Sequence, residues 1–260
     1  MSVNIKLVVF DWAGTTIDYG CMAPPGAFVA AFAHFGVTVS LPEARGPMGL
    51  HKKDHLRAML SQAEIGQRWQ SSRGRPWIES DVQEMYEIVT PMQVAAAKKH
   101  SALIPGTLEC VAQLRAKGII VAASTGYFHE AANVIYSAAK EQGFIPDYTI
   151  CADDVPAGRP APWMIFRTME TLGVYPASAV VKVGDTVVDI QDGLNAGAWS
   201  LGVIDSSNEM GLTKEEFENL SASERETKRA YVKNRYEREG AHGIVNTLLE
   251  LPAMIESLSK

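Results

Sequence analysis

Short apolar runs along the chain predict the strands of a parallel sheet. Residues 5–10 form a run that is rich in branched side chains and ends at the turn-forming sequence Asp-Trp-Ala-Gly, as is typical of a buried strand. Plausible helices precede each of the other candidate strands, which are residues 119–123, 148–151, 179–183 and 199–203. This alternation of helices and strands predicts an α/β fold built on a parallel sheet.

The alternation stops between about residue 20 and residue 99. Only helical patterns follow one another there, at residues 25–35, 53–62 and 80–99. We therefore predict a catalytic core made of residues 1–19 and 100–260, with residues 20–99 inserted as a small helical cap domain.

Two charged segments lie outside these elements. Residues 66–76 contain Arg68, Arg73 and Arg75 among turn-forming residues, which suits either a phosphate-steering loop or a solvated connector. We favour the connector. Residues 213–238 are rich in Glu, Lys and Arg at helical spacing and predict a solvated surface helix.

Composition indicates the class of protein more than its function. The 260 residues are 47% hydrophobic and 21% charged, as in ordinary globular proteins, and the formal net charge of -6 gives no reason to expect nucleic-acid binding. Three cysteines without metal-type spacing argue against a disulfide scaffold or a structural zinc site and fit a reducing cytoplasm. The apolar run at residues 5–10 is too short for a signal peptide or a membrane span, so we expect a cytoplasmic protein.

Two acidic segments that follow predicted strands indicate a divalent cation. Asp11 ends the first strand, and Asp185 and Asp189 follow the strand at residues 179–183. Ligands of open parallel sheets bind beyond the carboxyl ends of the strands, so these segments should converge. Carboxylates, together with the backbone carbonyl of Ala13, are hard oxygen ligands that suit Mg²⁺. A single strand-end Asp could equally cap a helix, but the pairing favours a metal site.

Side chains suited to a phosphoryl group are also present. A carboxylate that attacks phosphorus needs its product charge neutralised, and Arg159 in Gly-Arg-Pro is a candidate cation. Thr125 and Gly126, after the strand at residues 119–123, can add a hydroxyl and a backbone donor. Each signal is weak alone, because a Thr-Gly pair is usually a turn and a surface arginine is usually solvated. Their order along the chain strengthens them.

This order resembles the haloacid dehalogenase superfamily, in which a nucleophilic Asp precedes a Ser or Thr, a Lys or Arg, and a Gly-Asp-x-x-x-Asp loop. The matching residues are Asp11, Thr125, Arg159, and Asp185 with Asp189. Ser124 fits the second motif less well than Thr125. The resemblance spans the chain and implies a Rossmann-like core and an aspartyl-phosphate intermediate. It also implies Mg²⁺ bound by Asp11, the Ala13 carbonyl and Asp185, with Asp189 behind these ligands.

One departure from the family pattern concerns the general acid. Phosphatases of this superfamily normally carry a second Asp two residues after the nucleophile, and Ala13 stands there in this chain. General acid catalysis typically supplies a rate factor of about 10²–10⁴, so losing it would cost an alkoxide-releasing enzyme about 3–5 kcal/mol. Either the chain is impaired or its leaving group is not an alkoxide.

The predicted cap offers chemistry that could replace the acid. Within residues 48–55, a helix that begins near Leu50 would place Lys52 and His55 on one face. An amine beside an imidazole suggests imine chemistry, because a protonated imine accepts the electrons of a carbon leaving group and becomes an enamine. Burial would have to lower the lysine pKa from about 10.4. A Lys-Lys pair is most often solvated, and Lys53 is the alternative amine, but helix face and motif register favour Lys52.

Longer motifs extend the resemblance to the phosphonoacetaldehyde hydrolases. These are Asp-Trp-Ala-Gly-Thr-Thr-x-Asp-Tyr-Gly, Met-Gly-Leu-x-Lys-x-Asp-His, Thr-Gly-Tyr and Gly-Arg-Pro-x-Pro-Trp-Met. The resemblance implies hydrolysis of a carbon–phosphorus bond, with Lys52 forming the imine and His55 shuttling a proton. It implies a pocket lined by Cys21, Met48, Gly49 and Tyr127. It also implies a homodimer formed through the cap.

Two other functions stay open at this point. A phosphate-ester phosphatase or phosphomutase of the same superfamily would form no trappable imine, and Ala13 argues against it. A catalytically inactive phosphate-binding or regulatory protein would also lack the acid. The intact Asp11, Thr125, Arg159 and acidic loop argue against that second alternative.

Overall fold

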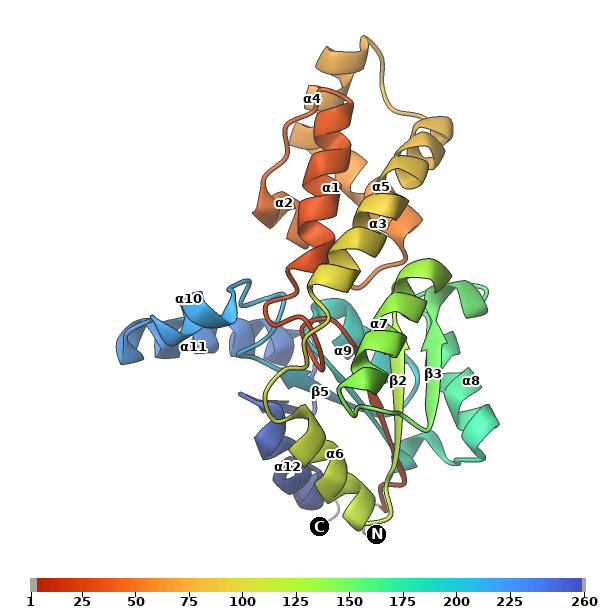
Figure 1. Ribbon diagram of the computed structural model, residues 1–260, viewed down its shortest axis with the longest axis vertical. Helices are drawn as coiled ribbons and strands as arrows, with labels where there is room; N and C mark the ends of the chain where they lie inside the picture. Colours follow the sequence, from red (N-terminus) through yellow and green to blue (C-terminus); the bar gives the residue numbers. More distant parts are fainter. Residues whose placement is uncertain (1–3, 259–260) are drawn as a thin grey trace.

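A six-stranded parallel sheet forms the lower part of the molecule, and a bundle of helices stands above its edge (Figure 1). The computed structural model describes residues 4–258. The strands, which pair in the order β3-β2-β1-β4-β5-β6, are β1 Leu7–Phe10, β2 Ile120–Thr125, β3 Tyr148–Cys151, β4 Val180–Gly184, β5 Trp199–Val203 and β6 Gly243–Val245. The predicted α/β fold is confirmed, and each of the five predicted strands is present. The short edge strand β6 was not predicted.

Strand β1 lies at the centre of the sheet because its side chains are apolar in both directions. Leu7 and Val9 pack into the hydrophobic cluster on one face, and Val8 and Phe10 pack into the cluster on the other. A strand that is covered on both faces needs such a continuous apolar run.

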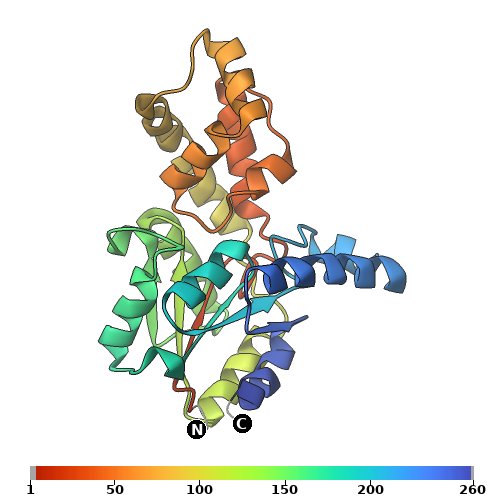
Figure 2. The same cartoon turned by 180° about the vertical axis from the view of Figure 1, so that it is seen from behind.

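Helices cover both faces of the sheet. One face carries α6 Thr107–Ala116, α7 His129–Glu141 and α12 Leu251–Leu258, whose buried residues share the cluster of Val8 and Phe10. The opposite face carries α8 Trp163–Leu172 and α9 Val187–Asn195, seen from behind in Figure 2. Within residues 4–258, the structure contains no helix with the length and apolar character of a membrane span.

The helical part has a hydrophobic core of its own. It consists of α1 Ala23–His34, α2 Leu41–Arg45, α3 Lys52–Leu60, α4 Ala63–Arg73 and α5 Glu79–Lys99. Phe28, Phe32, Trp69 and Met85 are fully buried in this core. The three predicted helices of this region are present, and α2 and α4 were not predicted.

The expectation of a connector at residues 66–76 was wrong for most of its length, because α4 extends to Arg73. Ile65 and Trp69, one turn apart, are fully buried and give this segment an apolar side. Arg68 forms an ion pair with Glu43, and Arg75 forms one with Asp81 at 2.7 Å. These ion pairs hold the helical part together, so the arginines offer no support for phosphate steering.

The charged C-terminal segment forms two helices instead of one, α10 Lys214–Glu218 and α11 Ala222–Arg238 (Figure 1). The break has a local cause, because Ser221 and Glu224 form a capping box that starts a new helix. Helix α11 is also more than a solvated surface helix. Its Tyr236 is fully buried and donates a hydrogen bond of 2.6 Å to the carbonyl of Asp185.

Two chain segments join the helical part to the sheet. Ile17 forms a β-bridge with Leu103, and the amide of Asp18 donates to the carbonyl of Ala102. The carboxylate of Asp18 accepts hydrogen bonds from the amides of Met22 and Ala23, at the start of α1. The two connections are therefore bonded to each other.

The domain division at residues 19/20 and 99/100 stays a prediction, which core substitutions can test. Trp69→Ala opens a cavity in the helical part and should destabilise it by about 3–5 kcal/mol. We expect amide hydrogen exchange to accelerate in α1–α5 and to stay unchanged in the sheet. Phe144→Ala, in the hydrophobic core of the sheet, is the matched control. It should accelerate exchange in the sheet and leave α1–α5 unchanged. Acceleration throughout the chain in both variants would contradict two separate folding units.

Candidate active site

A small cavity of about 30 Å³ lies where the helical part meets the carboxyl ends of the strands. Every predicted site residue except His55 lines it. The lining residues are Asp11, Ala13, Cys21, Pro24, Met48, Gly49, Lys52, Thr125, Gly126, Tyr127, Arg159, Asp185, Thr186 and Asp189. Pro24 and Thr186 were not predicted. Thr186 could have been predicted from its position in the Gly-Asp-Thr sequence that follows a strand. In the structure its hydroxyl caps α9 and donates a hydrogen bond of 2.6 Å to Asp189.

The pairing of β1 with β4 places Asp11 near Asp185, and a tight loop after β1 brings Gly14 and Thr15 to Asp185. The amides of residues 15–17 donate to the carbonyl of Trp12, which turns the chain sharply back. Gly14 within this loop has a φ of +87°, and a Cβ there would lie 2.0 Å from a carboxylate oxygen of Asp185. Only glycine fits this position, for reasons of both conformation and space.

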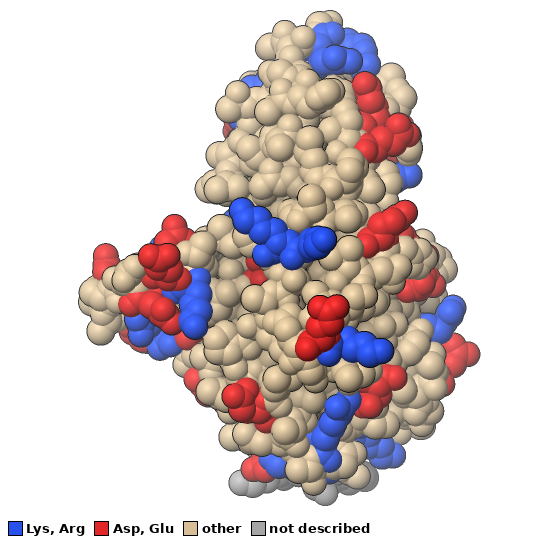
Figure 3. All heavy atoms as spheres, in the orientation of Figure 1, with Lys and Arg blue, Asp and Glu red and all other residues tan. Residues whose placement is uncertain are grey.

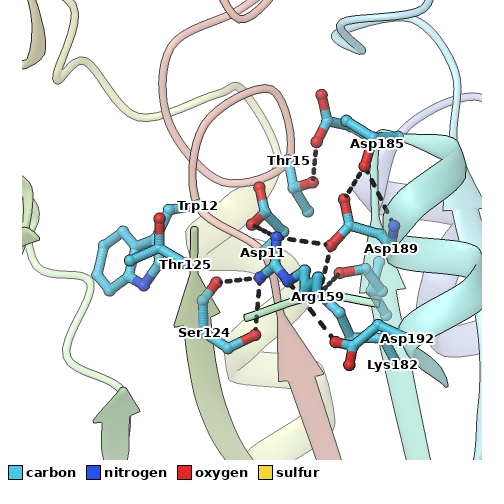
Figure 4. A network of polar contacts seen from close by, with 12 residues as sticks. Asp11, Trp12, Thr15, Ser124, Thr125, Arg159, Lys182, Asp185, Asp189 and Asp192 are labelled. Carbon is cyan, nitrogen blue, oxygen red and sulfur yellow. Dashed lines mark hydrogen bonds and ion pairs between the residues drawn. The ribbon is translucent and has the colours of Figure 1, made fainter. Parts of the chain in front are cut away.

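Arg159 is the centre of the charged network (Figure 4). Its side chain is 1% exposed, and its Nη1 lies 2.6 Å from Oδ1 of Asp11 and 2.9 Å from Oδ1 of Asp189. Its Nη2 donates to the carbonyl and the hydroxyl of Ser124. Ser124 therefore holds the arginine from below, while Thr125 lines the cavity, in agreement with the preference for Thr125 as the motif residue.

The two acidic residues after β4 have different surroundings. Asp185 accepts a hydrogen bond from the amide of Asn208, and burial, followed by the charge of Asp11, raises its pKa well above the usual range. Burial would also raise the pKa of Asp189, but the charges of Arg159 and Lys182 outweigh burial and lower it to about 2. Asp189 is thus paired with cations of the protein, whereas Asp185 lacks one.

The buried charges at this edge do not balance. When the carboxylates here are ionised and Lys52 of the helical part is neutral, four carboxylates stand against two cations, a surplus of two negative charges. A protonated Lys52, which lines the same cavity, lowers this surplus to one. The carboxylates are those of Asp11, Asp185, Asp189 and Asp192, and the cations are Arg159 and Lys182. Oxygen atoms of Asp11, Asp185 and Asp189 all lie within 4.8 Å of one another. A divalent cation would restore the balance, so these residues fit a metal site by charge, ligand type and spacing.

Lys52 reaches the cavity from the helical part. It is the first residue of α3, is 3% exposed, and its Nζ lies 4.9 Å from the ring centre of Tyr127. Among residues 4–258 it has no ion-pair partner, and burial lowers its pKa to about 8. Lys53 does not line the cavity and lies over the ring of Tyr86 instead. The structure thus distinguishes the two lysines, which the sequence did not fully do.

His55 lies behind Lys52 and not in the cavity. It is fully buried, stacks on Phe28 at 3.8 Å between ring centres, and donates from Nε2 to the carbonyl of Ala44. Burial lowers its pKa well below the usual range, and the charge of Lys52 acts in the same direction. The imidazole is therefore neutral, and its Nδ1 has no hydrogen-bond partner among the described residues.

The helical part and the sheet touch through backbone atoms near the cavity. A Cβ at Gly126 would lie 2.8 Å from the carbonyl oxygen of Gly49. Met48 and Cys21 flank this contact, and both are buried. Cys21 adopts a φ of +49°, which is uncommon outside glycine and is typical of strained functional segments. The geometry therefore encloses the cavity between two close-fitting surfaces.

Comparisons with known proteins agree with this arrangement. The sequence model of the haloacid dehalogenase-like hydrolases matches residues 5–197. The chain is 43% identical over 258 residues to a phosphonoacetaldehyde hydrolase of Bacillus thuringiensis, covering 99% of this chain and 98% of that protein. A phosphonoacetaldehyde hydrolase of Syntrophobacter fumaroxidans is 44% identical over 98% of this chain and 92% of its own length.

A solved structure has nearly the same fold. The crystal structure of a phosphonoacetaldehyde hydrolase like protein from Oleispira antarctica aligns with a TM-score of 0.97 at 37% identity. The alignment covers 100% of this chain and 94% of that one. Sequence and fold thus indicate the same group of proteins.

The environment of Lys52 makes a measurable prediction about its amine. Because burial opposes the charged form, the amine should titrate near pH 8, being protonated below and neutral above. The measurement is the pH dependence of lysine Cε chemical shifts in the ¹³C-labelled protein. The Lys52→Arg variant identifies the signal by its loss. A midpoint above about 10, the ordinary lysine value, would contradict the buried environment.

Proposed function

The chain belongs to the haloacid dehalogenase-like hydrolases and, within them, to the phosphonoacetaldehyde hydrolase family, and we propose that it hydrolyses phosphonoacetaldehyde to acetaldehyde and phosphate. One observation carries this proposal. The buried amine of Lys52 and the carboxylate of Asp11 line the same small cavity, and Ala13 stands where an acid would protonate an alkoxide. This site suits a leaving group that departs as carbon and is stabilised by an amine.

Lys52 first condenses with the aldehyde. The neutral amine attacks the carbonyl carbon, water leaves, and a protonated imine forms. The pKa of about 8 for Lys52 leaves roughly a tenth of its amine neutral at pH 7. At the ordinary lysine pKa, about one part in a few thousand would be neutral. Imine formation does not need Lys53, whose side chain lies outside the cavity lining.

Asp11 then attacks phosphorus. A carboxylate oxygen forms the new bond to phosphorus while the carbon–phosphorus bond breaks, and the released electron pair moves into the imine to give an enamine. Arg159 and the Thr125 hydroxyl stabilise the charge on the phosphoryl oxygens. The protonated imine takes over the role of the missing general acid, because it accepts the electron pair of the breaking bond and no alkoxide is left to protonate.

Water completes the cycle. It cleaves the aspartyl phosphate to release phosphate and restore Asp11. The enamine gains a proton at the former phosphorus-bearing carbon, and hydrolysis of the imine frees acetaldehyde and Lys52. The neutral His55 beside Lys52 supports a role as proton relay through the lysine, since it does not line the cavity. One water is released and two are consumed, which balances the hydrolysis.

We propose Mg²⁺ as the cation of the site, held by Asp11, Asp185 and the Ala13 carbonyl. The surplus of buried negative charge supports this assignment. When bound, the ion polarises the phosphoryl oxygens and offsets their charge. Asp189 stays behind these ligands, because its Oδ1 forms ion pairs with Arg159 and Lys182 and its Oδ2 accepts a hydrogen bond from Thr186.

The size of the cavity supports a mobile helical part. About 30 Å³ is the space of about one water molecule, too little for the substrate. We propose that residues 20–99 act as a cap that moves away to admit phosphonoacetaldehyde and then closes, which excludes water from the charged site.

We also propose a homodimer formed through this cap. Gly26, Ala30 and Ala33 are exposed along one side of α1, and small side chains let two helices approach closely. The middle of the cap face in Figure 3 carries few charged side chains, which agrees with such a contact. Sedimentation equilibrium of the wild type and an Ala30→Glu variant would test it.

Borohydride trapping tests the imine. The protein is incubated with phosphonoacetaldehyde and Mg²⁺, reduced, and digested, and the adduct is located by peptide mass spectrometry. We expect the adduct on Lys52, with phosphate release in the unreduced sample. Lys52→Arg should lose both, because a guanidinium keeps the charge but cannot form the imine.

The matched control is Lys53→Arg, one residue along the same helix. It should retain the adduct and at least half of the turnover. An adduct on Lys53, or substantial turnover by Lys52→Arg, would overturn the lysine assignment. No adduct in the wild type, together with release of phosphate from sugar phosphates, would support a phosphate-ester phosphatase instead.

Thermal unfolding tests the cation. Mg²⁺ at about 100 times its dissociation constant should stabilise the wild type by about 2.7 kcal/mol, because it relieves the surplus negative charge of the folded state. Asp185→Asn removes one ligand charge and should lose most of this shift. The control Asp81→Asn lies in the helical part and should keep it. An equal Mg²⁺ shift in Asp185→Asn would contradict the assignment.

A further inference from the structure

Asp192 is a buried carboxylate that the proposed chemistry has not yet used. It lies on α9, one turn beyond Asp189, and is fully buried. Neither of its carboxyl oxygens has a hydrogen-bond partner among the described residues. Figure 4 shows it on the side of Arg159 away from Asp11. A buried carboxylate without partners is costly, so its presence calls for a function.

One nitrogen of the Arg159 guanidinium makes no hydrogen bond to the described residues. Its Nη1 is engaged by Asp11 and Asp189, and its Nη2 donates twice to Ser124. The remaining nitrogen is Nε, which has no hydrogen-bond partner among the described residues and lies 3.6 Å from Oδ2 of Asp192. The two groups thus form an ion pair whose separation is slightly longer than a hydrogen bond, and burial raises the pKa of Asp192 to about 7.

The contact between Arg159 Nε and Asp192 matters for phosphoryl transfer because the other side of the guanidinium faces the nucleophile. The guanidinium nitrogen that donates to the nucleophile Asp11 is Nη1. Asp11 is the partner that the reaction removes, because its carboxylate becomes an acyl phosphate and the negative charge moves to the phosphoryl group. The Nη1 donor must then turn from Asp11 to a phosphoryl oxygen while the rest of the guanidinium keeps its place.

We propose that Asp192 is a positioning residue that holds Arg159 through Nε while Nη1 transfers from Asp11 to the phosphoryl group. The inference rests on the proposed function, since it requires a phosphoryl group at Asp11. Lys182 does not take this role, because its amine pairs with Asp189 at 2.8 Å. Asp192 contacts neither the substrate nor the cation in this scheme and acts only through the arginine.

A positioning role for Asp192 and a purely structural role predict different effects of removing its charge on thermal stability. The site already carries a surplus of negative charge, so removal of the Asp192 charge should not destabilise the folded protein. A residue that served only the fold would behave differently, because its loss would lower the unfolding temperature. Phosphate affinity and thermal stability therefore separate the two roles.

The experiment measures inorganic phosphate binding by calorimetry in the presence of Mg²⁺, and kcat/KM with phosphonoacetaldehyde. Asp192→Asn keeps the shape and removes the charge. We expect the phosphate Kd to rise and kcat/KM to fall, each by about tenfold, with no fall in the unfolding temperature without metal. Asp192→Ser, which is smaller and fits without strain, should show the same loss of affinity if the first variant does not fold.

Two controls make the test specific. Asp81 is also a buried carboxylate paired with an arginine, Arg75, but lies in the helical part, so Asp81→Asn should leave phosphate affinity unchanged. In an Arg159→Lys background, Asp192→Asn should weaken phosphate binding by less than twofold, because the group through which it acts is gone.

Three results would overturn the proposal. Asp192 has no positioning role if Asp192→Asn and Asp192→Ser bind phosphate as the wild type does. The same conclusion follows if Asp192→Asn weakens phosphate binding equally in the wild-type and Arg159→Lys backgrounds. A wild-type protein that neither binds phosphate nor releases it from phosphonoacetaldehyde would refute the proposed function itself, and the role of Asp192 with it.

Discussion

The rest of the site depends on a surplus of negative charge buried at the carboxyl edge of the sheet. Asp11, Asp185, Asp189 and Asp192 are gathered there, and among residues 4–258 the sheet side opposes them with Arg159 and Lys182, while the helical part adds Lys52. Such a cluster is costly in a low-dielectric interior, and a protein selected for stability alone would avoid it. In the proposed function, the same imbalance attracts a divalent cation, holds the arginine in place and prepares the site for a phosphoryl group. Stability is given up where function requires it.

In the proposed mechanism, the reaction is divided between two separately packed parts. The sheet supplies the nucleophile and the charges that hold phosphorus, and the helical part supplies the amine that activates the carbon. Neither set suffices alone, because Lys52 reaches Asp11 only across the boundary between the two hydrophobic cores. The close backbone contact of Gly49 with Gly126 makes that boundary tight enough to bury the amine and lower its pKa. In the proposed mechanism, closure of the cap over the sheet would therefore also lower the pKa of the lysine.

Much of the fold and site followed from the sequence because the signals are local. The apolar runs that became β1–β5 end at polar turns, and this places Asp11, Thr125 and Asp185 at one edge of a parallel sheet. Ala13 in place of the usual acid, together with Lys52 in a chain that carries the phosphoryl-transfer motifs, indicated imine chemistry at a carbon–phosphorus bond. Helix α4 was missed because its apolar side rests on only Ile65 and Trp69 among many polar residues. Strand β6 is only three residues long and gives almost no signal.

By itself, then, the sequence determined the α/β fold class, the family and most of the residues that line the cavity, since motifs and periodicity are local features of the chain. Only the tertiary structure decided how their charges combine. It placed His55 behind Lys52, assigned Ser124 to Arg159 and left Asp192 without a hydrogen-bond partner among the described residues. It also separated Lys52 from Lys53, which are neighbours in the chain but differ in burial. Burial and electrostatic balance depend on groups brought together from distant segments, and no local pattern records them.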